Sequence, residues 1–250
     1  MHYLERGAGV PLVLLHAFPL DSRMWEAQVQ ELSGEFRVIA PDFAGFGQSA
    51  SDQPFTIDSM AEDVHELLRI LNALPCALGG ISMGGYVALA FASSYAADLR
   101  ALILVDTKAD ADNAQQRDAR QKMIDLARSQ GSKAVADQMV PKLLAEETPK
   151  TRPAVAQAVR RMAESCPAKT IEHALAALRD RPDRTALLPT IKVPTLVLVG
   201  EGDVITPVTV AESMHRAIPG SQLTIIRGAG HLPPVEQPAQ TSGAISRFLR

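Results

Sequence analysis

The chain has 250 residues, of which 46% are hydrophobic and 21% are charged, and its formal net charge is −3. This composition predicts an ordinary globular protein with a full core and excludes a disordered chain. The small negative charge argues against a nucleic-acid-binding protein, which usually has a basic excess. Two cysteines, Cys76 and Cys166, are too few for a disulfide framework, so we expect reduced thiols and a cytoplasmic protein.

Neither a targeting segment nor a membrane partner is expected. The residues after Met1 lack the basic and then apolar layout of a signal peptide. The longest apolar stretch, residues 10–18, is interrupted by Pro11 and His16. It is far shorter than the ~20 residues that cross a bilayer.

Six short runs rich in Val, Ile and Leu are typical of strands. Most are continuously apolar, which indicates strands covered on both faces, as in a parallel sheet. The runs are residues 10–15, 36–40, 77–81, 101–105, 194–199 and 222–226. Helical patterns lie between them at residues 56–72, 84–94 and 207–217. This alternation predicts an α/β fold with a mostly parallel central sheet flanked by helices.

Residues 108–190 differ from the rest because they contain no strand-like run. Gly131 and several prolines divide the segment into four predicted helices, at residues 113–130, 132–145, 152–164 and 168–179. The segment has 15 Lys and Arg against 11 Asp and Glu, and no aromatic residue. We expect a core formed by residues 1–107 and 191–250, with a helical insertion at 108–190.

The pentapeptide Gly80-Ile81-Ser82-Met83-Gly84 is the strongest functional signal. It lies between an apolar strand and an apolar helix, which is the setting of a nucleophile elbow. The glycines let neighbouring backbone approach without a Cβ clash. The helix that begins there adds N–H groups and a partial positive charge. We therefore expect Ser82 to be a catalytic nucleophile.

A serine nucleophile needs a base within hydrogen-bond reach and an acid that orients this base. Among six histidines, His231 is the best candidate, because Gly and Pro keep its loop non-helical just after a predicted strand. Asp203 and Asp106 both follow strands, where sites of open α/β sheets form, and both keep the order serine, acid, histidine. Asp203 is preferred because its strand precedes the one that delivers His231, and Asp106 stays the alternative.

Residues 16–19, His-Ala-Phe-Pro, predict an oxyanion loop after the first strong strand. Two backbone N–H groups must point at one oxygen. Met83, which follows the nucleophile, supplies one, and Phe18 the other, because Pro19 has no N–H. His16 itself is interpreted as a structural, hydrogen-bonded histidine.

No cofactor and no metal are expected. Residues 45–50 match the pattern G-x-G-x-x-A of dinucleotide-binding turns. Pro54 follows too soon for the turn to open into a helix, and no acidic residue ends a second strand ~20 positions on. No cluster of Cys and His has the spacing of metal ligands.

Together these motifs resemble those of the α/β-hydrolase superfamily over nearly the whole chain. Its carboxylesterase and 3-oxoadipate enol-lactonase-like subgroup looks closest, and the resemblance implies that the insertion is a cap. Ala17 and Ala44 depart from the usual glycine and arginine, so we expect Asp42 to pair with another group. Five segments carry the resemblance: residues 16–19, 41–49, 80–84, 200–207 and 230–238, the last with Glu236 and Pro238.

The resemblance implies a serine hydrolase that cleaves carboxylic esters or lactones of small substrates through an acyl-enzyme on Ser82. A C–C bond hydrolase and a cofactor-free perhydrolase or haloperoxidase of the same fold stay open. A receptor that binds a small ligand without catalysis is the alternative from another class, although it would not need a full Ser-His-Asp set. Haloalkane dehalogenases and epoxide hydrolases use an aspartate where Ser82 stands, so they are disfavoured.

The substrate pocket is expected to include Trp25 of the core together with Met123, Met139 and Met162 of the insertion. An insertion without aromatic residues cannot stack on an aromatic substrate. Its positive balance could attract an anionic substrate, but a solvated outer face explains these charges more simply. The sequence leaves the oligomeric state open, with a homodimer among the alternatives.

Overall fold

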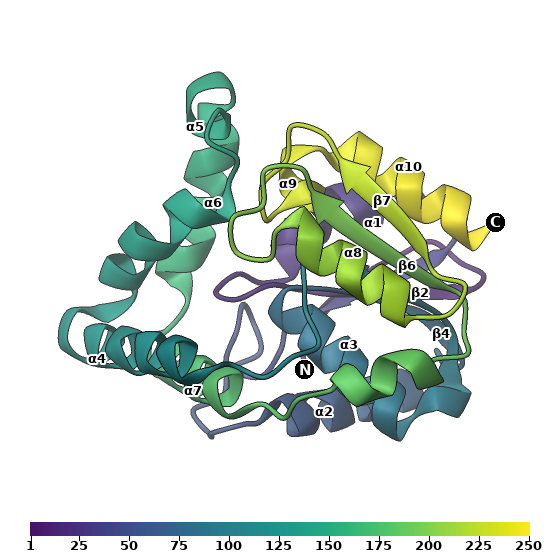
Figure 1. Cartoon of the computed structure of the whole chain (residues 1–250), viewed down its shortest axis with the longest axis horizontal. Coiled ribbons are helices and arrows are strands. Elements are labelled where there is room, and N and C mark those ends of the chain that lie inside the picture. The colour runs from purple at the N-terminus through teal and green to yellow at the C-terminus, as the bar shows by residue number, and fades with distance from the viewer.

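The continuous apolar runs form the buried strands of a seven-stranded sheet (Figure 1). The computed structural model describes all residues, 1–250. The strand order is β1-β3-β2-β4-β5-β6-β7, and all neighbours are parallel except β1 with β3. The strands are β1 (Tyr3–Arg6), β2 (Pro11–Leu15), β3 (Arg37–Pro41), β4 (Cys76–Ile81), β5 (Leu99–Val105), β6 (Thr195–Gly200) and β7 (Gln222–Ile226). The predicted α/β class and parallel sheet are confirmed.

Helices cover both faces of the sheet. One core contains apolar residues of α2 (Ile57–Ile70), α3 (Met83–Ser94) and α8 (Val208–Ala217), and a second core contains those of α1 (Glu26–Leu32) and α10 (Pro238–Leu249). Three 3₁₀ turns, η1 (Ser22–Trp25), η2 (Ala96–Asp98) and η3 (Thr185–Thr190), and the short α9 (Pro233–Glu236) complete this part. None of the helices combines the length and the apolar character that a bilayer crossing requires.

A layer of four helices between β5 and β6 projects to one side of the sheet (Figure 1). They are α4 (Ala114–Leu143), α5 (Thr148–Thr151), α6 (Pro153–Ser165) and α7 (Ala168–Asp180). α4 packs along α6 and α7. It is bent at Gly131, whose φ of +78° lies outside the helical region, at the predicted break. The segment contains helices and no strand, as expected, while the boundaries at 107/108 and 190/191 stay predictions.

Cys76 and Cys166 give a direct check of this packing. Both thiols are free and buried, and burial raises the pKa of each to about 12. Because the thiolate is the reactive form, we expect almost no reaction of the native protein with a disulfide reagent such as DTNB at pH 8. Both thiols should react after unfolding in guanidinium. Fast labelling of the native protein would contradict this packing.

Candidate active site

Ser82 occupies the sharp turn between β4 and α3. Its backbone has φ +53° and ψ −114°, a conformation that residues other than glycine rarely adopt and that costs ~1–3 kcal/mol. Two hydrogen bonds hold it there. The Ser82 N–H donates to the Val105 carbonyl at 3.0 Å, and the Thr107 hydroxyl donates to the Ser82 carbonyl at 2.9 Å. The half-buried side chain therefore stands at the carboxyl end of β4, in the geometry of an elbow.

The two glycines that flank Ser82 are required by close backbone contacts. A Cβ on Gly80 would lie 2.1 Å from the Gly84 carbonyl oxygen, and a Cβ on Gly84 would lie 2.3 Å from the Leu15 carbonyl oxygen. The first contact closes the turn. The second lets α3 pack directly against the end of β2, next to the expected oxyanion loop.

Asp203 and His231 form a buried pair at the ends of β6 and β7. His231 Nδ1 lies 2.8 Å from Asp203 Oδ2, and the two residues are 1% and 5% exposed. The backbone N–H groups of Ile205 and Thr206 donate to Asp203 Oδ1, and the Thr206 hydroxyl donates to Oδ2 at 2.6 Å. Burial acts to raise the pKa of Asp203, but the hydrogen bonds from His231 and Thr206 outweigh it and hold the pKa well below 3.8. Asp203 is thus a carboxylate that can orient the imidazole.

Ser82 is not hydrogen-bonded to His231 in this structure. Because Asp203 uses Nδ1 of the ring, Nε2 is the nitrogen that remains for a serine proton. Catalytic hydrogen bonds are often long or poorly aligned in unliganded enzymes, so this geometry does not exclude the contact. The strands that carry the three side chains, β4, β6 and β7, run parallel within one sheet. Their loops therefore leave the sheet at the same edge.

The loop after β2 has a fixed conformation and a free backbone N–H, the two properties that an oxyanion hole needs. A turn fixes the loop, with the Leu20 N–H donating to the Ala17 carbonyl at 2.9 Å. The Phe18 N–H makes no hydrogen bond within the protein. The Met83 N–H belongs to the first turn of α3, where N–H groups have no partner inside the helix. Phe18 and Met83 therefore stay the candidate donors.

His16 lies beneath this loop as a structural residue, as expected. Its Nε2 accepts the Phe43 N–H at 3.1 Å, and its Nδ1 lies 3.0 Å from the Ala17 carbonyl oxygen, to which it donates. Burial lowers the pKa of His16, so the ring is neutral. It ties the oxyanion loop to the segment after β3.

Asp42 is paired through other groups in the absence of the usual arginine. It accepts the backbone N–H groups of Ser22 and Gln48 at 2.8 and 2.9 Å, and His2 Nδ1 lies 2.8 Å away. Burial acts to raise the pKa of Asp42, but the hydrogen bonds from Gln48 and Ser22 outweigh it and lower the pKa overall. The expectation that Asp42 finds another partner is confirmed.

Glu236 joins the loop that carries His231 (residues 227–232, the histidine loop) to the helical insertion. Its side chain is buried, with Oε2 accepting the Gly230 N–H at 2.6 Å and Oε1 accepting the Ala145 N–H and the Thr148 hydroxyl at 2.8 and 2.5 Å. A Cβ on Gly230 would lie only 2.4 Å from the Ala145 nitrogen. The Arg152 guanidinium donates to the backbone carbonyl of Glu236. The sequence placed Glu236 in a motif but gave no sign of these partners.

The four expected pocket residues lie in the core or at its edge. Trp25 is completely buried, and its indole N–H has no partner in the protein. Met162 is buried, and Met123 and Met139 are half-buried against the core. Their contact with a substrate stays a prediction.

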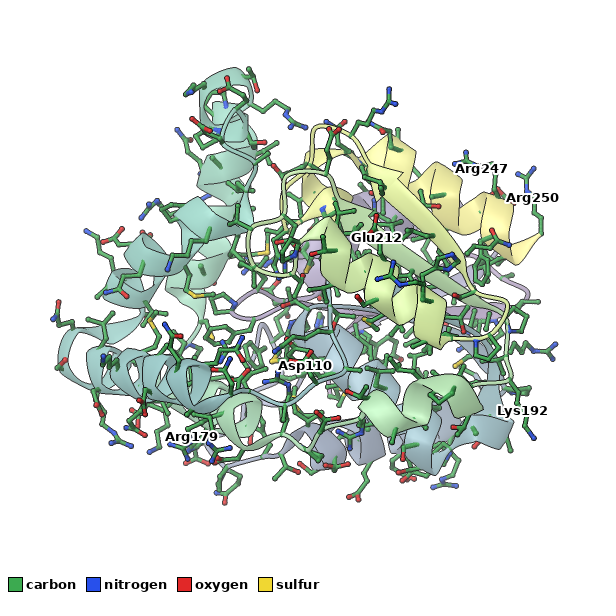
Figure 2. The ribbon with its side chains drawn as sticks, in the orientation of Figure 1. Asp110, Arg179, Lys192, Glu212, Arg247 and Arg250 are labelled. Atoms are coloured by element: carbon green, nitrogen blue, oxygen red, sulfur yellow. The ribbon has the colours of Figure 1, made fainter.

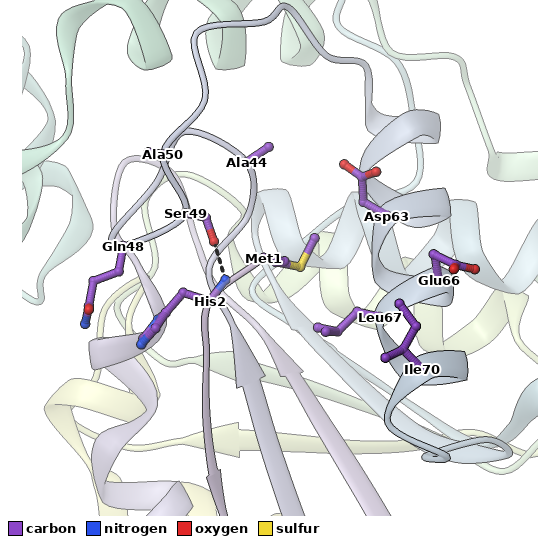
Figure 3. A pocket seen from close by; sticks show the side chains of 10 residues that line it. All are labelled: Met1, His2, Ala44, Gln48, Ser49, Ala50, Asp63, Glu66, Leu67 and Ile70. Carbon is purple, nitrogen blue, oxygen red and sulfur yellow. Dashed lines mark hydrogen bonds between the residues drawn. The ribbon is translucent and has the colours of Figure 1, made fainter.

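A surface hollow of about 420 Å³ lies elsewhere, between the N-terminus, the loop after β3 and α2 (Figure 3). His2 and Ser49 line one side of it, and Asp63 and Glu66 line the other. No member of the Ser82, Asp203 and His231 set borders it. It is therefore separate from the candidate active site.

Most of the positive charge of the insertion is neutralised locally. Ten of its Lys and Arg side chains lie within 4.0 Å of a carboxylate. Arg179, for example, pairs with Asp180 on the outer side of α7 (Figure 2). Five Lys and Arg side chains have no carboxylate partner. Arg152 is half-buried, and the other four are exposed: Lys122, Lys133, Lys142 and Arg161. This arrangement favours a solvated outer face over a charged entrance.

The sequence matches the family described as alpha/beta hydrolase fold over residues 10–238, so the chain belongs to this family. A thermophilic esterase from Thermogutta terrifontis, solved with malate bound, is 43% identical with a TM-score of 0.97, covering 100% of this chain and 92% of its own. The 3-oxoadipate enol-lactonase 1 of Acinetobacter baylyi is 29% identical over 96% of this chain and 88% of its own. A bromoperoxidase from Bacillus anthracis is 25% identical with a TM-score of 0.89, covering 99% of this chain and 94% of its own. The resemblance to esterases and enol-lactonases is confirmed.

The Glu236 contacts can be tested with Glu236→Gln. The amide NH₂ cannot accept a hydrogen bond, so one or more of the three donors around Glu236 would be left unpaired. A buried unpaired donor costs ~1–3 kcal/mol, and we expect a loss of stability of that size in urea unfolding. Glu146→Gln is the matched control, because Glu146 is exposed on the same link between α4 and α5. Equal stability of the two variants would rule out this function of Glu236.

Proposed function

We propose that this protein is a serine hydrolase that cleaves carboxylic esters or lactones of small substrates through an acyl-enzyme on Ser82. The observation that carries the proposal is the buried Asp203–His231 pair at the sheet edge that also presents Ser82 in its strained turn. A hydroxyl, an imidazole and a carboxylate at one edge match the needs of acyl transfer. Among other classes of protein, a receptor would have no need of this set.

In the proposed acylation step, Ser82 Oγ attacks the substrate carbonyl carbon and its proton moves to His231 Nε2. The Asp203 carboxylate holds the ring with Nδ1 protonated and stabilises the imidazolium. The oxyanion that forms is held by the Phe18 and Met83 N–H groups. When the tetrahedral intermediate collapses, the C–O bond to the leaving alcohol breaks and the alcohol takes the proton from His231.

In the proposed deacylation step, the same groups act on water. His231 Nε2 removes a proton from a water molecule, which attacks the acyl carbon. The second tetrahedral intermediate breaks its bond to Ser82 Oγ, and His231 returns the proton to the serine. For a lactone, the leaving alcohol stays attached to the acyl group until this step releases the hydroxy acid.

The substrate class rests on two kinds of support. The Thermogutta esterase and the Acinetobacter enol-lactonase are similar to this chain over nearly its whole length. The expected pocket residues Met123, Met139 and Met162 are apolar and aliphatic, which suits a small acyl group better than an aromatic one.

A cytoplasmic location and a homodimer stay predictions.

A perhydrolase or haloperoxidase activity is the second candidate, favoured by the similarity to the Bacillus anthracis bromoperoxidase. Hydrogen peroxide would replace water as the acceptor of the acyl group, and a peracid would be the product. The hydrolase and the perhydrolase share the acyl-enzyme and differ in the molecule that accepts the acyl group. Adding peroxide to an ester assay separates them, because a hydrolase yields acid and a perhydrolase yields peracid. A panel of diketones tests the C–C hydrolase alternative in the same assay.

Ser82→Ala should abolish hydrolysis of a short p-nitrophenyl ester. Loss of a serine nucleophile removes covalent catalysis and leaves only what binding and the oxyanion hole provide, so kcat should fall by ~10³-fold or more. The measurement is kcat on purified protein, paired with labelling by a fluorophosphonate, which modifies an activated serine.

Ser93→Ala is the matched control, because Ser93 is an exposed serine near the end of α3, the helix that follows Ser82. It should keep full activity and full labelling. If Ser82→Ala retains most of the activity, or if the native protein is not labelled at Ser82, the proposed mechanism is wrong. A receptor would bind its ligand without either reaction.

Salt should have little effect on substrate choice. Because the cations of the insertion other than Arg152 are paired with carboxylates or exposed, they should not focus a field on the site. We expect the ratio of kcat/KM between an acidic ester and a neutral ester of the same length to change by less than about 2-fold between low and high ionic strength. A large fall in this ratio with salt would show that the insertion steers anionic substrates.

A further inference from the structure

Asp106 lies beside the Asp203–His231 pair and has no part in the mechanism above. It follows β5, the strand between β4 and β6, and is 1% exposed. One ligand atom from each of Asp106, Asp203 and His231 lies within 4.8 Å of the other two. Two carboxyl groups therefore share a dry space with one imidazole.

Hydrogen-bond donors are divided unequally between the two carboxyl groups. Asp203 accepts four, from two backbone N–H groups, a threonine hydroxyl and the imidazole. Asp106 accepts one, the Gly200 N–H at 2.9 Å from Oδ1, and its buried Oδ2 has no partner. Because donors stabilise the charged form of a carboxyl group, the negative charge belongs on Asp203.

Two carboxyl groups this close in a buried site do not both ionise. A protonated carboxyl group has an O–H that can donate a hydrogen bond. We propose that Asp106 is a positioning residue that holds a proton on Oδ2 and donates it in a hydrogen bond to the Asp203 carboxylate. The pair then carries a single negative charge, and Asp203 gains a fifth donor that fixes its orientation toward His231. The effect on rate rests on the proposed function, whereas the effect on stability does not.

The surroundings of Asp106 support a neutral group. Burial raises the pKa of Asp106 well above its ordinary value of 3.8, and the charge of Asp203 raises it further. Two other titratable groups lie near or act on Asp106: His231, which is bonded to Asp203, and Glu236, whose charge acts in the same direction as that of Asp203.

This protonation has a defined effect on stability. The unfolded chain loses the Asp106 proton near the ordinary pKa of about 4, while the folded chain keeps this proton up to its own, higher pKa. Between these two pKa values the folded state binds more protons than the unfolded state. The contribution of Asp106 to stability therefore falls as the pH rises from about 4 through the folded-state pKa.

Asp106→Asn tests the proposal without a substrate. The amide oxygen can still accept the Gly200 N–H and the amide NH₂ can still donate to Asp203, but no proton is held. We expect Tm at pH 7.5 to be at least ~4 °C higher than in the unsubstituted protein, with the difference shrinking toward pH 4. Asp118→Asn is the control, an exposed carboxylate on α4 that should leave Tm unchanged at both pH values. A lower Tm for Asp106→Asn at pH 7.5, or a difference that does not vary with pH, would overturn the proposal.

Kinetics give a second, separate test. Asp106→Ala removes the donor to Asp203, and we expect kcat to fall by ~10-fold or more, with Asp106→Asn recovering most of the loss. The acid limb of the kcat/KM profile should stay in place in Asp106→Asn, because a neutral group replaces a neutral group. If Asp106 were an anion, Asn would remove a charge next to the imidazole and shift this limb to lower pH, which would overturn the proposal. If the protein lacks esterase activity, the thermal test still decides the protonation of Asp106.

Discussion

The buried hydrogen bond between Asp203 and His231 is the constraint on which the rest of this structure depends. An ionised carboxylate in a dry environment is costly unless several donors compensate it. Here the compensation comes from the turn after Asp203, whose backbone N–H groups and Thr206 hydroxyl converge on the carboxylate together with the imidazole. The imidazole can reach it because β6 and β7 are parallel neighbours, so the two loops leave the sheet together. The fold thus supplies the geometry, and the turn supplies the electrostatic balance.

The position of His231 is fixed from outside its own loop as well. Glu236 accepts the N–H of Gly230, the residue before the histidine, and it also accepts two groups of the segment between α4 and α6. One carboxylate therefore connects the histidine backbone to the insertion. The absence of a side chain on Gly230 lets the two backbones approach closely enough for this shared acceptor. A movement of the insertion would have to break these bonds or carry the histidine loop with it.

The sequence could predict those parts of the site that a short local pattern encodes. Ser82 lies in a glycine-flanked turn between an apolar strand and an apolar helix, and that pattern needs only five residues in a row. Asp203 contacts His231 Nδ1 and Asp106 does not, which agrees with the preference drawn from strand order. The partners of Glu236 could not be predicted, because Ala145 lies 91 residues away and the contact depends on how the insertion packs. The sequence does not indicate the strand β1 either, because Tyr3-Leu-Glu-Arg is a short, half-polar edge strand that pairs only with β3.

The insertion is anchored a second time, on the nucleophile side of the site. Arg181 follows α7, and its guanidinium carbon lies 4.3 Å from the ring centre of Tyr86 while it also pairs with buried Asp112 at 2.8 Å. Tyr86 lies one helical turn after Ser82, to whose carbonyl its N–H donates. The start and end of the insertion therefore meet at α3 through Asp112 and Arg181, whereas its middle is held at the histidine loop through Glu236. Because both anchors are buried polar contacts, loss of either would leave buried polar groups without a partner, which is more costly than loss of an exposed ion pair. The insertion is thus held at two points, one at α3 and one at the loop that carries His231, and its packing and the geometry of the site depend on the same few residues.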